Sequence, residues 1–212
     1  MELGIKSRLS PFIKTNIAVF NADTTNDIVI GASNAGRNSF TNAPKTNRQG
    51  VEGSAQFKLP YSFETNLAYT WLRATVKESY LTNSTNLSTF NTVESGNQIP
   101  GVPNQGLFAE LLWVKPNKSV EAAIEARANG AMDANDLNTQ YKAPGYAVMN
   151  IRGVLRQEIA GGWSFSQFFR LNNVFARSYV GSVIVNQFFL RSYESAPTRN
   201  WMIGAKASYQ FH

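Results

Sequence analysis

The chain has 212 residues, enough for one sizeable domain, and its 20 basic and 14 acidic side chains leave a dispersed net charge of +6. The absence of cysteine excludes disulfide scaffolds and cysteine-based metal sites, and the single histidine, His212, excludes a histidine-dependent triad or metal centre in the body of the chain. No run of Lys or Arg exceeds two residues and no apolar stretch approaches the roughly 20 residues of a membrane helix. We therefore expect neither nucleic acid as a partner nor a helical membrane anchor.

A period-two alternation of apolar and polar side chains predicts strands along almost the whole chain. From Phe63 to Trp71 the odd positions are Phe, Thr, Leu, Tyr and Trp, whereas the even positions include Glu64 and Asn66. Nine segments show this pattern, near residues 1–9, 12–30, 47–58, 63–80, 105–115, 120–131, 145–158, 164–180 and 200–211. Several exceed the five or six residues that are usual for a strand in a globular protein.

The connections between these segments alternate between short and long. The short ones contain Pro or Gly, which favour tight turns, and lie at residues 10–11, 60–62, 116–119 and 161–162. The long ones are rich in Asn, Ser, Thr and Gly, and lie at residues 31–46, 81–104, 132–144 and 181–199. Short turns at one end and long polar loops at the other are typical of a transmembrane β-barrel. We therefore expect an all-β, antiparallel, up-and-down meander.

Each predicted strand has one apolar and one polar face, which fits two kinds of barrel. A soluble barrel fills its interior with the apolar face, whereas an outer-membrane barrel turns that face to lipid and lines its lumen with the polar one. Periodicity alone does not separate these alternatives. Strand length, the asymmetry of the connections and a group of aromatic residues beside the short turns favour the membrane barrel; these are Phe12, Tyr61, Phe63, Trp113, Trp163 and Phe165.

Short motifs occur in a fixed order along the chain. They are ELGIK at 2–6, NIAVFNAD at 16–23, TNA at 41–43 before RQGVE at 48–52, IPGVP at 99–103, and LNNVF at 171–175 followed by Tyr179, Gly181, RNW at 199–201 and YQF at 209–211. This series resembles the late strands of TonB-dependent outer-membrane receptors. The resemblance implies that residues 1–212 form a single domain, the C-terminal part of such a barrel, without the plug domain and signal peptide. Nine strands of the family's 22 imply an open curved sheet or a partial barrel.

The resemblance also implies a location in the outer membrane of a Gram-negative cell and uptake of a ferric siderophore or a similar bulky nutrient. The implied partners are membrane lipid, that ligand and, in the full-length receptor, a plug domain and TonB. Two alternatives stay open: an independent small outer-membrane barrel that acts as a passive pore or adhesin, and, far less favoured, a barrel hydrolase. The hydrolase lacks the histidine that such enzymes use, so we expect no enzyme, no catalytic residue and no cofactor.

The candidate ligand residues are cations on the polar face, namely Arg127, Arg152 and Arg170. Positive side chains along a lumen would attract an anionic ferric chelate, although the same residues would also keep the lumen hydrated or contact a plug. The long loops, above all 81–104, are further candidates for ligand recognition, because loops on rigid scaffolds commonly carry function. Two pairs of aspartates, at positions 23 and 27 and at 133 and 136, are too few oxygen ligands for calcium, so we expect no metal site.

Overall fold

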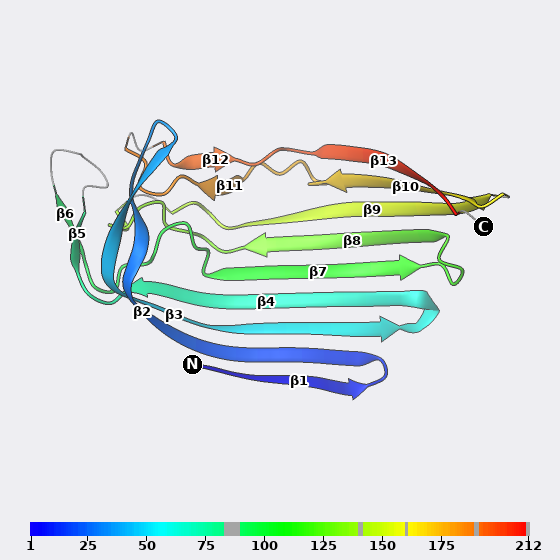
Figure 1. Ribbon diagram of the computed structural model, residues 1–212, viewed down its shortest axis with the longest axis horizontal. Helices are drawn as coiled ribbons and strands as arrows, with labels where there is room; N and C mark the ends of the chain where they lie inside the picture. Colours follow the sequence, from blue (N-terminus) through cyan, green and yellow to red (C-terminus); the bar gives the residue numbers. More distant parts are fainter. Residues whose placement is uncertain (83–89, 140–141, 160, 189–190, 211–212) are drawn as a thin grey trace.

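The structure is a computed structural model that describes residues 1–82, 90–139, 142–159, 161–188 and 191–210. Its main feature is one antiparallel sheet of nine strands in sequential order, β1-β2-β3-β4-β7-β8-β9-β10-β13 (Figure 1). The strands are β1 (Glu2–Ser10), β2 (Ile13–Asn34), β3 (Arg37–Leu59), β4 (Phe63–Val76), β7 (Gln105–Val114), β8 (Val120–Asn129), β9 (Tyr146–Ile159), β10 (Trp163–Asn172) and β13 (Asn200–Tyr209). The predicted nine-stranded meander is confirmed, and within the described residues no pairing joins β1 to β13.

The four short connections lie at one end of the sheet, as the alternation of loop lengths predicts (Figure 1). Each uses a residue that tolerates a tight turn. The Phe12 N–H donates to the Ser10 hydroxyl at 3.1 Å in the first turn, and the 3-10 turn Pro60–Ser62 places Tyr61 at φ 60°. The last turn uses Gly161 and Gly162, both with positive φ, a conformation that glycine adopts without steric cost.

The segment 31–46, predicted as a long loop, is instead a continuation of β2 and β3. The two strands pair through Asn34 and Arg37, and a two-residue turn with Ala35 at φ 46° and Gly36 at φ 78° closes the hairpin. Two positive φ values give the turn a twist that matches the twist of the flanking strands. Figure 1 shows this hairpin leaving the sheet and rising across its end toward β12. Residues 31–46 show no apolar–polar alternation, because Asn, Ser and Thr occupy both faces of these strands.

Two other long connections contain short hairpins of their own. β5 (Tyr80–Thr82) pairs with β6 (Asn91–Val93), and β11 (Val180–Val183) pairs with β12 (Tyr193–Ser195). The predicted strand 164–180 ends earlier, at Asn172, because Asn173 at φ 50° turns the chain and its side chain bonds to Arg177. The end of the sheet with long connections is therefore folded rather than irregular.

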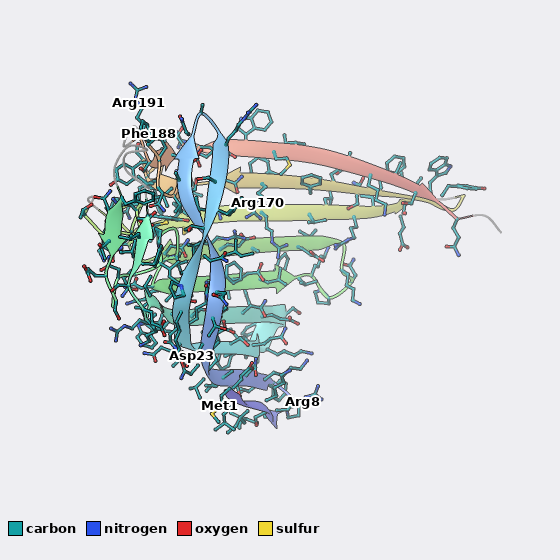
Figure 2. The ribbon with its side chains drawn as sticks, turned by 60° about the vertical axis from the view of Figure 1, so that its left-hand side comes forward. Met1, Arg8, Asp23, Arg170, Phe188 and Arg191 are labelled. Atoms are coloured by element: carbon teal, nitrogen blue, oxygen red, sulfur yellow. The ribbon has the colours of Figure 1, made fainter. Side chains whose placement is uncertain are left out.

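The buried residues gather at this end, where the long connections meet. Fully buried side chains there are mostly small or polar, including Ala43, Val93, Ala134, Ala143, Asn186 and Ser192. The β2–β3 hairpin reaches the last connection, where the Ser33 N–H donates to the Asn186 carbonyl at 3.0 Å and the Phe188 N–H donates to the Ser33 carbonyl at 3.0 Å. Figure 2 shows the hairpin standing in front of the sheet, with Phe188 at the upper left, beside the upper part of the hairpin. We call this assembly of long connections the cap.

Candidate functional site

On the main sheet, side chains of the charged face are less exposed to solvent than side chains of the apolar face. On β8, Glu125 is 4% exposed, whereas its neighbour Ile124, on the opposite face, is 46% exposed. On the two edge strands, β1 and β13, Leu3 and Ile203 are 73% and 65% exposed. A soluble protein shows the reverse, because water solvates charges and apolar surface is buried. The sheet therefore has a polar inner face and an apolar outer face, as in a barrel whose outside meets lipid.

The strand register brings two carboxylates together on the polar face. Asn66 on β4 lies directly opposite Glu110 on β7, and Glu110 lies directly opposite Glu125 on β8. Like charges directly opposite one another destabilise a sheet. The arrangement therefore needs cations from neighbouring strands.

Arg152 on β9 and Arg170 on β10 supply these cations. Arg170 binds Glu125 with two parallel hydrogen bonds, Nη1 to Oε1 at 2.9 Å and Nη2 to Oε2 at 2.6 Å. Arg152 spans both carboxylates, from Nη2 to Glu110 Oε2 at 2.6 Å and from Nε to Glu125 Oε1 at 3.2 Å. The Asn66 amide completes the chain with a hydrogen bond of 2.9 Å to Glu110 Oε1. We call these five residues the inner network; it crosses five strands, β4, β7, β8, β9 and β10.

Arg127, the third predicted ligand residue, lies on the same face but outside the inner network. Its guanidinium carbon is 5.5 Å from the centre of the Phe108 ring, the residue opposite it on β7. This is the distance of a cation–π contact. The structure thus brings Arg152 and Arg170 together on shared carboxylates and leaves Arg127 exposed beside an aromatic ring.

A second cationic group lies near the first strand of the sheet. Lys6, Arg8 and Lys14 line a groove of about 660 Å³ that extends from β1 across β4 to β7, and Arg8 lies directly opposite Lys14. Figure 2 shows Arg8 near the β1 edge. The alternation places Lys6 and Arg8 on the polar face, but their grouping with Lys14 depends on the β1–β2 register, which the sequence alone did not give. No acidic side chain is among the described residues that line this groove.

The cap contains a second polar cluster, centred on Asp136 and Asn186. The Asn186 amide donates to the Ile30 carbonyl at 2.6 Å and to Asp136 Oδ2 at 3.1 Å, while its oxygen accepts from the Asp136 N–H at 3.0 Å. Asn97 donates to the Asp136 carbonyl at 2.9 Å. Burial, together with the neighbouring Asp136 carboxylate, raises the pKa of Tyr80 well above its ordinary value. The β2–β3 hairpin and the three long connections therefore meet in one cluster, which sequence reasoning missed.

Asp27, one of the aspartates considered for calcium, is held by an ion pair instead. Its Oδ2 accepts from Arg48 Nη2 at 2.8 Å and from the Thr46 hydroxyl at 2.6 Å. Burial acts to raise the pKa of this carboxyl, but the hydrogen bonds from Thr46 and Arg48 and the Arg48 charge lower it overall. Among the described residues, no three His, Cys, Asp or Glu side chains gather in a way that would hold a metal ion. No helix in that part of the chain is long and apolar enough to span a membrane.

Comparison with known proteins gives a family and a set of related structures. A family model described as "TonB dependent receptor-like, beta-barrel" matches residues 1–174. Among solved structures, the siderophore receptor PiuA from Acinetobacter baumannii is 16% identical, with a TM-score of 0.71 over 97% of this chain. The ferric citrate transporter FecA is 15% identical, with a TM-score of 0.74 over 98% of the chain. The ferric yersiniabactin uptake receptor FyuA from Yersinia pestis is 18% identical, with a TM-score of 0.68 over the whole chain.

These neighbours are much longer than the chain, which covers 27% of PiuA, 30% of FecA and 29% of FyuA. At this level of identity the likeness shows the fold. The family and these neighbours are transport receptors and not enzymes.

Proposed function

Because the chain belongs to the family of TonB-dependent receptor β-barrels, we propose that it forms nine neighbouring wall strands of an outer-membrane receptor. The receptor takes up a ferric siderophore or a similar bulky nutrient with energy delivered through TonB. The observation that carries this proposal is the covered, charge-paired inner face of an open sheet whose outer face is apolar. Such a sheet fits a wide barrel with a hydrated lumen.

Each part of the polar face has a place in this function. The inner network fixes charged groups in the wall, so that the lumen is polar without a large net charge of either sign. Arg127 and the groove cations Lys6, Arg8 and Lys14 leave positive charge on the surface, which would draw an anionic chelate toward the lumen. We propose that Arg127 contacts the ligand or the plug, and that Arg152 and Arg170 line the same path while they hold Glu110 and Glu125.

The open edges weigh against an independent pore or adhesin built from this chain alone. The outward edges of β1 and β13 carry backbone groups without strand partners among the described residues. In lipid each unsatisfied backbone group costs several kcal/mol. Pairing with further strands of a larger barrel removes that cost.

Uptake measured in the bacterium that carries the gene tests the proposal. The gene is deleted, and accumulation of ⁵⁵Fe is measured from catecholate, hydroxamate and citrate chelates, with and without TonB. We expect the deletion to abolish uptake of one chelate class, and restoration of the gene to recover it only in cells that have TonB. Unchanged uptake of every chelate, or recovery that does not need TonB, would contradict the proposal; the second result would favour a passive pore.

A further inference from the structure

One row of directly paired residues runs along the floor of the cationic groove on the inner face. The pairs, from β1 to β7, are Lys6 with Asn16, Asn16 with Ser54, Ser54 with Ala68, and Ala68 with Phe108. Side chains that lie directly opposite one another share a face of the sheet, so all five are on the polar face. The three in the middle are short. The open volume of about 660 Å³ therefore lies between a cation on β1 and an aromatic ring on β7.

The cations of this groove have no acidic partner. Lys6, Arg8 and Lys14 are exposed, and within the described residues none of them forms an ion pair. Glu110, on the same face of β7, is held by the inner network. Glu52, on the same face of β3, does not line the groove. A cleft lined by one sign of charge concentrates ions of the opposite sign, so the groove attracts anions.

A second cavity, of about 710 Å³, adjoins the groove on the side of the short turns. Gln56 and Asn66, which lie opposite one another on β3 and β4, line the groove. The next pair on the same face, Lys58 with Glu64, lines the second cavity. The two spaces therefore follow one another along the strands, and the second one ends at the short turns.

The second cavity combines apolar walls with positive charge. Its apolar and its basic lining residues include Phe12, Phe63 and Val114, and Lys58, Lys115 and Lys118. The three lysines are exposed, and no ion pair joins them to Glu64 among the described residues. Both spaces fall within the roughly 300–1,000 Å³ of small-molecule sites. Apolar walls beside unpaired cations suit an anion that carries aromatic rings.

The other half of the inner face is arranged differently. There Arg152 and Arg170 are paired with Glu110 and Glu125, so their charge is satisfied within the wall. The unpaired cations of the groove and of the second cavity instead form a series that leads toward the end with the short turns. A single fixed contact needs one site, whereas successive sites that lead to one end of the wall suit a ligand that moves.

We propose that the groove and the second cavity form an exit path for a multiply anionic, aromatic ferric chelate of the tris-catecholate class. Its negative charge passes from the groove cations Lys6, Arg8 and Lys14 to the lysines of the second cavity, while its rings pack against the aromatic walls. A neutral hydroxamate chelate would gain nothing from these cations. This inference rests on the proposed transport function, and it adds the class of ligand and the side of the wall along which the ligand leaves.

Thiol labelling in the groove tests the path without requiring transport. Cysteine in place of Ala68, on the groove floor, is the only thiol of the chain. Outer-membrane vesicles that contain the protein are treated with an anionic or a cationic methanethiosulfonate reagent, and each rate is divided by the rate with a free thiol. We expect the anionic reagent to react at least about tenfold faster.

Charge-removing variants show which cations cause this preference. Lys6→Gln combined with Lys14→Gln should lower the ratio of the two rates at least about threefold. Lys206→Gln, which removes an exposed cation from the same face of β13, should leave the ratio unchanged. Ferric tris-catecholate should slow labelling at position 68, whereas a neutral ferric tris-hydroxamate should not. Lys14→Gln should weaken this protection, and Lys14→Arg should keep it.

The contrary results are equally specific. Equal rates for the two reagents, an unchanged ratio in the double variant, or protection by both chelates or by neither would overturn the proposal. Failure of both reagents to react would show that the groove is covered, for example by a plug, and would also overturn it. Gene-dependent uptake of a neutral chelate alone would contradict this inference and support the proposed function. Selective labelling and protection in a bacterium whose iron uptake does not depend on the gene would do the opposite.

Discussion

Glu125 shows how the polar face of this sheet is stabilised. Its carboxylate is almost fully buried and accepts hydrogen bonds from Arg152 and Arg170. The side chains of Arg152 and Arg170 are 27% and 23% exposed, so water screens their charges in part. The pairing of Glu125 with these two arginines offsets the repulsion between Glu125 and Glu110, which lie opposite one another.

Replacement of Glu125 by Gln should destabilise the sheet. The change leaves two arginines facing a neutral amide, and we expect a loss of about 2–3 kcal/mol in the free energy of unfolding, less than for a fully buried pair. Urea unfolding of the protein in detergent micelles measures this loss. Glu158→Gln, an exposed glutamate on β9, is the matched control; an equal effect of both changes would refute a stabilising role for the network.

The members of the inner network were predictable one by one, but their pairing was not. Alternation placed Arg152 and Arg170 on the polar face, and the structure agrees. Which carboxylate each one meets depends on register, because Arg152 reaches across β8 to Glu110. A shift of one residue would turn every side chain to the other face, and no short-range pattern fixes the register between strands joined by long connections.

At the scale of elements, two glycines on β3 have opposite surroundings. A Cβ added at Gly50 would overlap both the Phe20 ring and the Trp71 carbonyl oxygen. A Cβ added at Gly53, three residues away on the apolar face, would meet nothing within 4 Å. The close approach at Gly50 therefore requires glycine, whereas the position of Gly53 does not.

Alanine at these two positions gives a direct comparison. Gly50→Ala should lower stability by about 1–3 kcal/mol, because a backbone oxygen cannot move aside as a side chain can. Gly53→Ala should leave stability unchanged or raise it slightly, since alanine restricts the unfolded chain. Thermal melting of both variants in the same detergent decides the matter, and an equal loss in both would contradict the packing described for Gly50.

The cap depends on Asn186, which joins β2 to the connections before β9 and β13. Asn186→Ala leaves buried polar groups unpaired, at a cost of about 1–3 kcal/mol. We therefore expect trypsin to cleave after Arg37, at the hairpin tip, at least about fivefold faster than in the original protein. Asn34→Ala, an exposed change in the same hairpin, should not alter the rate. Equal cleavage of both variants would show that the hairpin is held by other contacts.

The cap was the part of the fold least accessible to sequence reasoning. Composition correctly located three of the four long connections, but it gave no sign that residues 31–46 form a hairpin or that Asp136 and Asn186 meet. Those contacts join residues as far apart as Ile30 and Asn186. Phe211, the last residue of the predicted strand 200–211, and His212 lie outside the described residues.

For the whole molecule, the number and order of the nine main-sheet strands followed from periodicity and turn chemistry, because both signals are local. The central claim is the orientation of the two faces: apolar side chains toward lipid, and the charged inner network toward a lumen. This claim explains why Glu125 is covered while Ile124 is exposed. It also underlies the proposed transport function.

Spin labels on single cysteines test this orientation most directly, because the sequence has no cysteine to remove. Labels at Leu67 and Ala68 on β4, and at Ala205 and Lys206 on β13, are compared in outer-membrane vesicles for collision with oxygen, which concentrates in lipid, and with a water-soluble nickel chelate. We predict that labels at 67 and 205 collide mainly with oxygen and that labels at 68 and 206 show much less oxygen collision. The reverse pattern, or no alternation between neighbouring positions, would contradict the account.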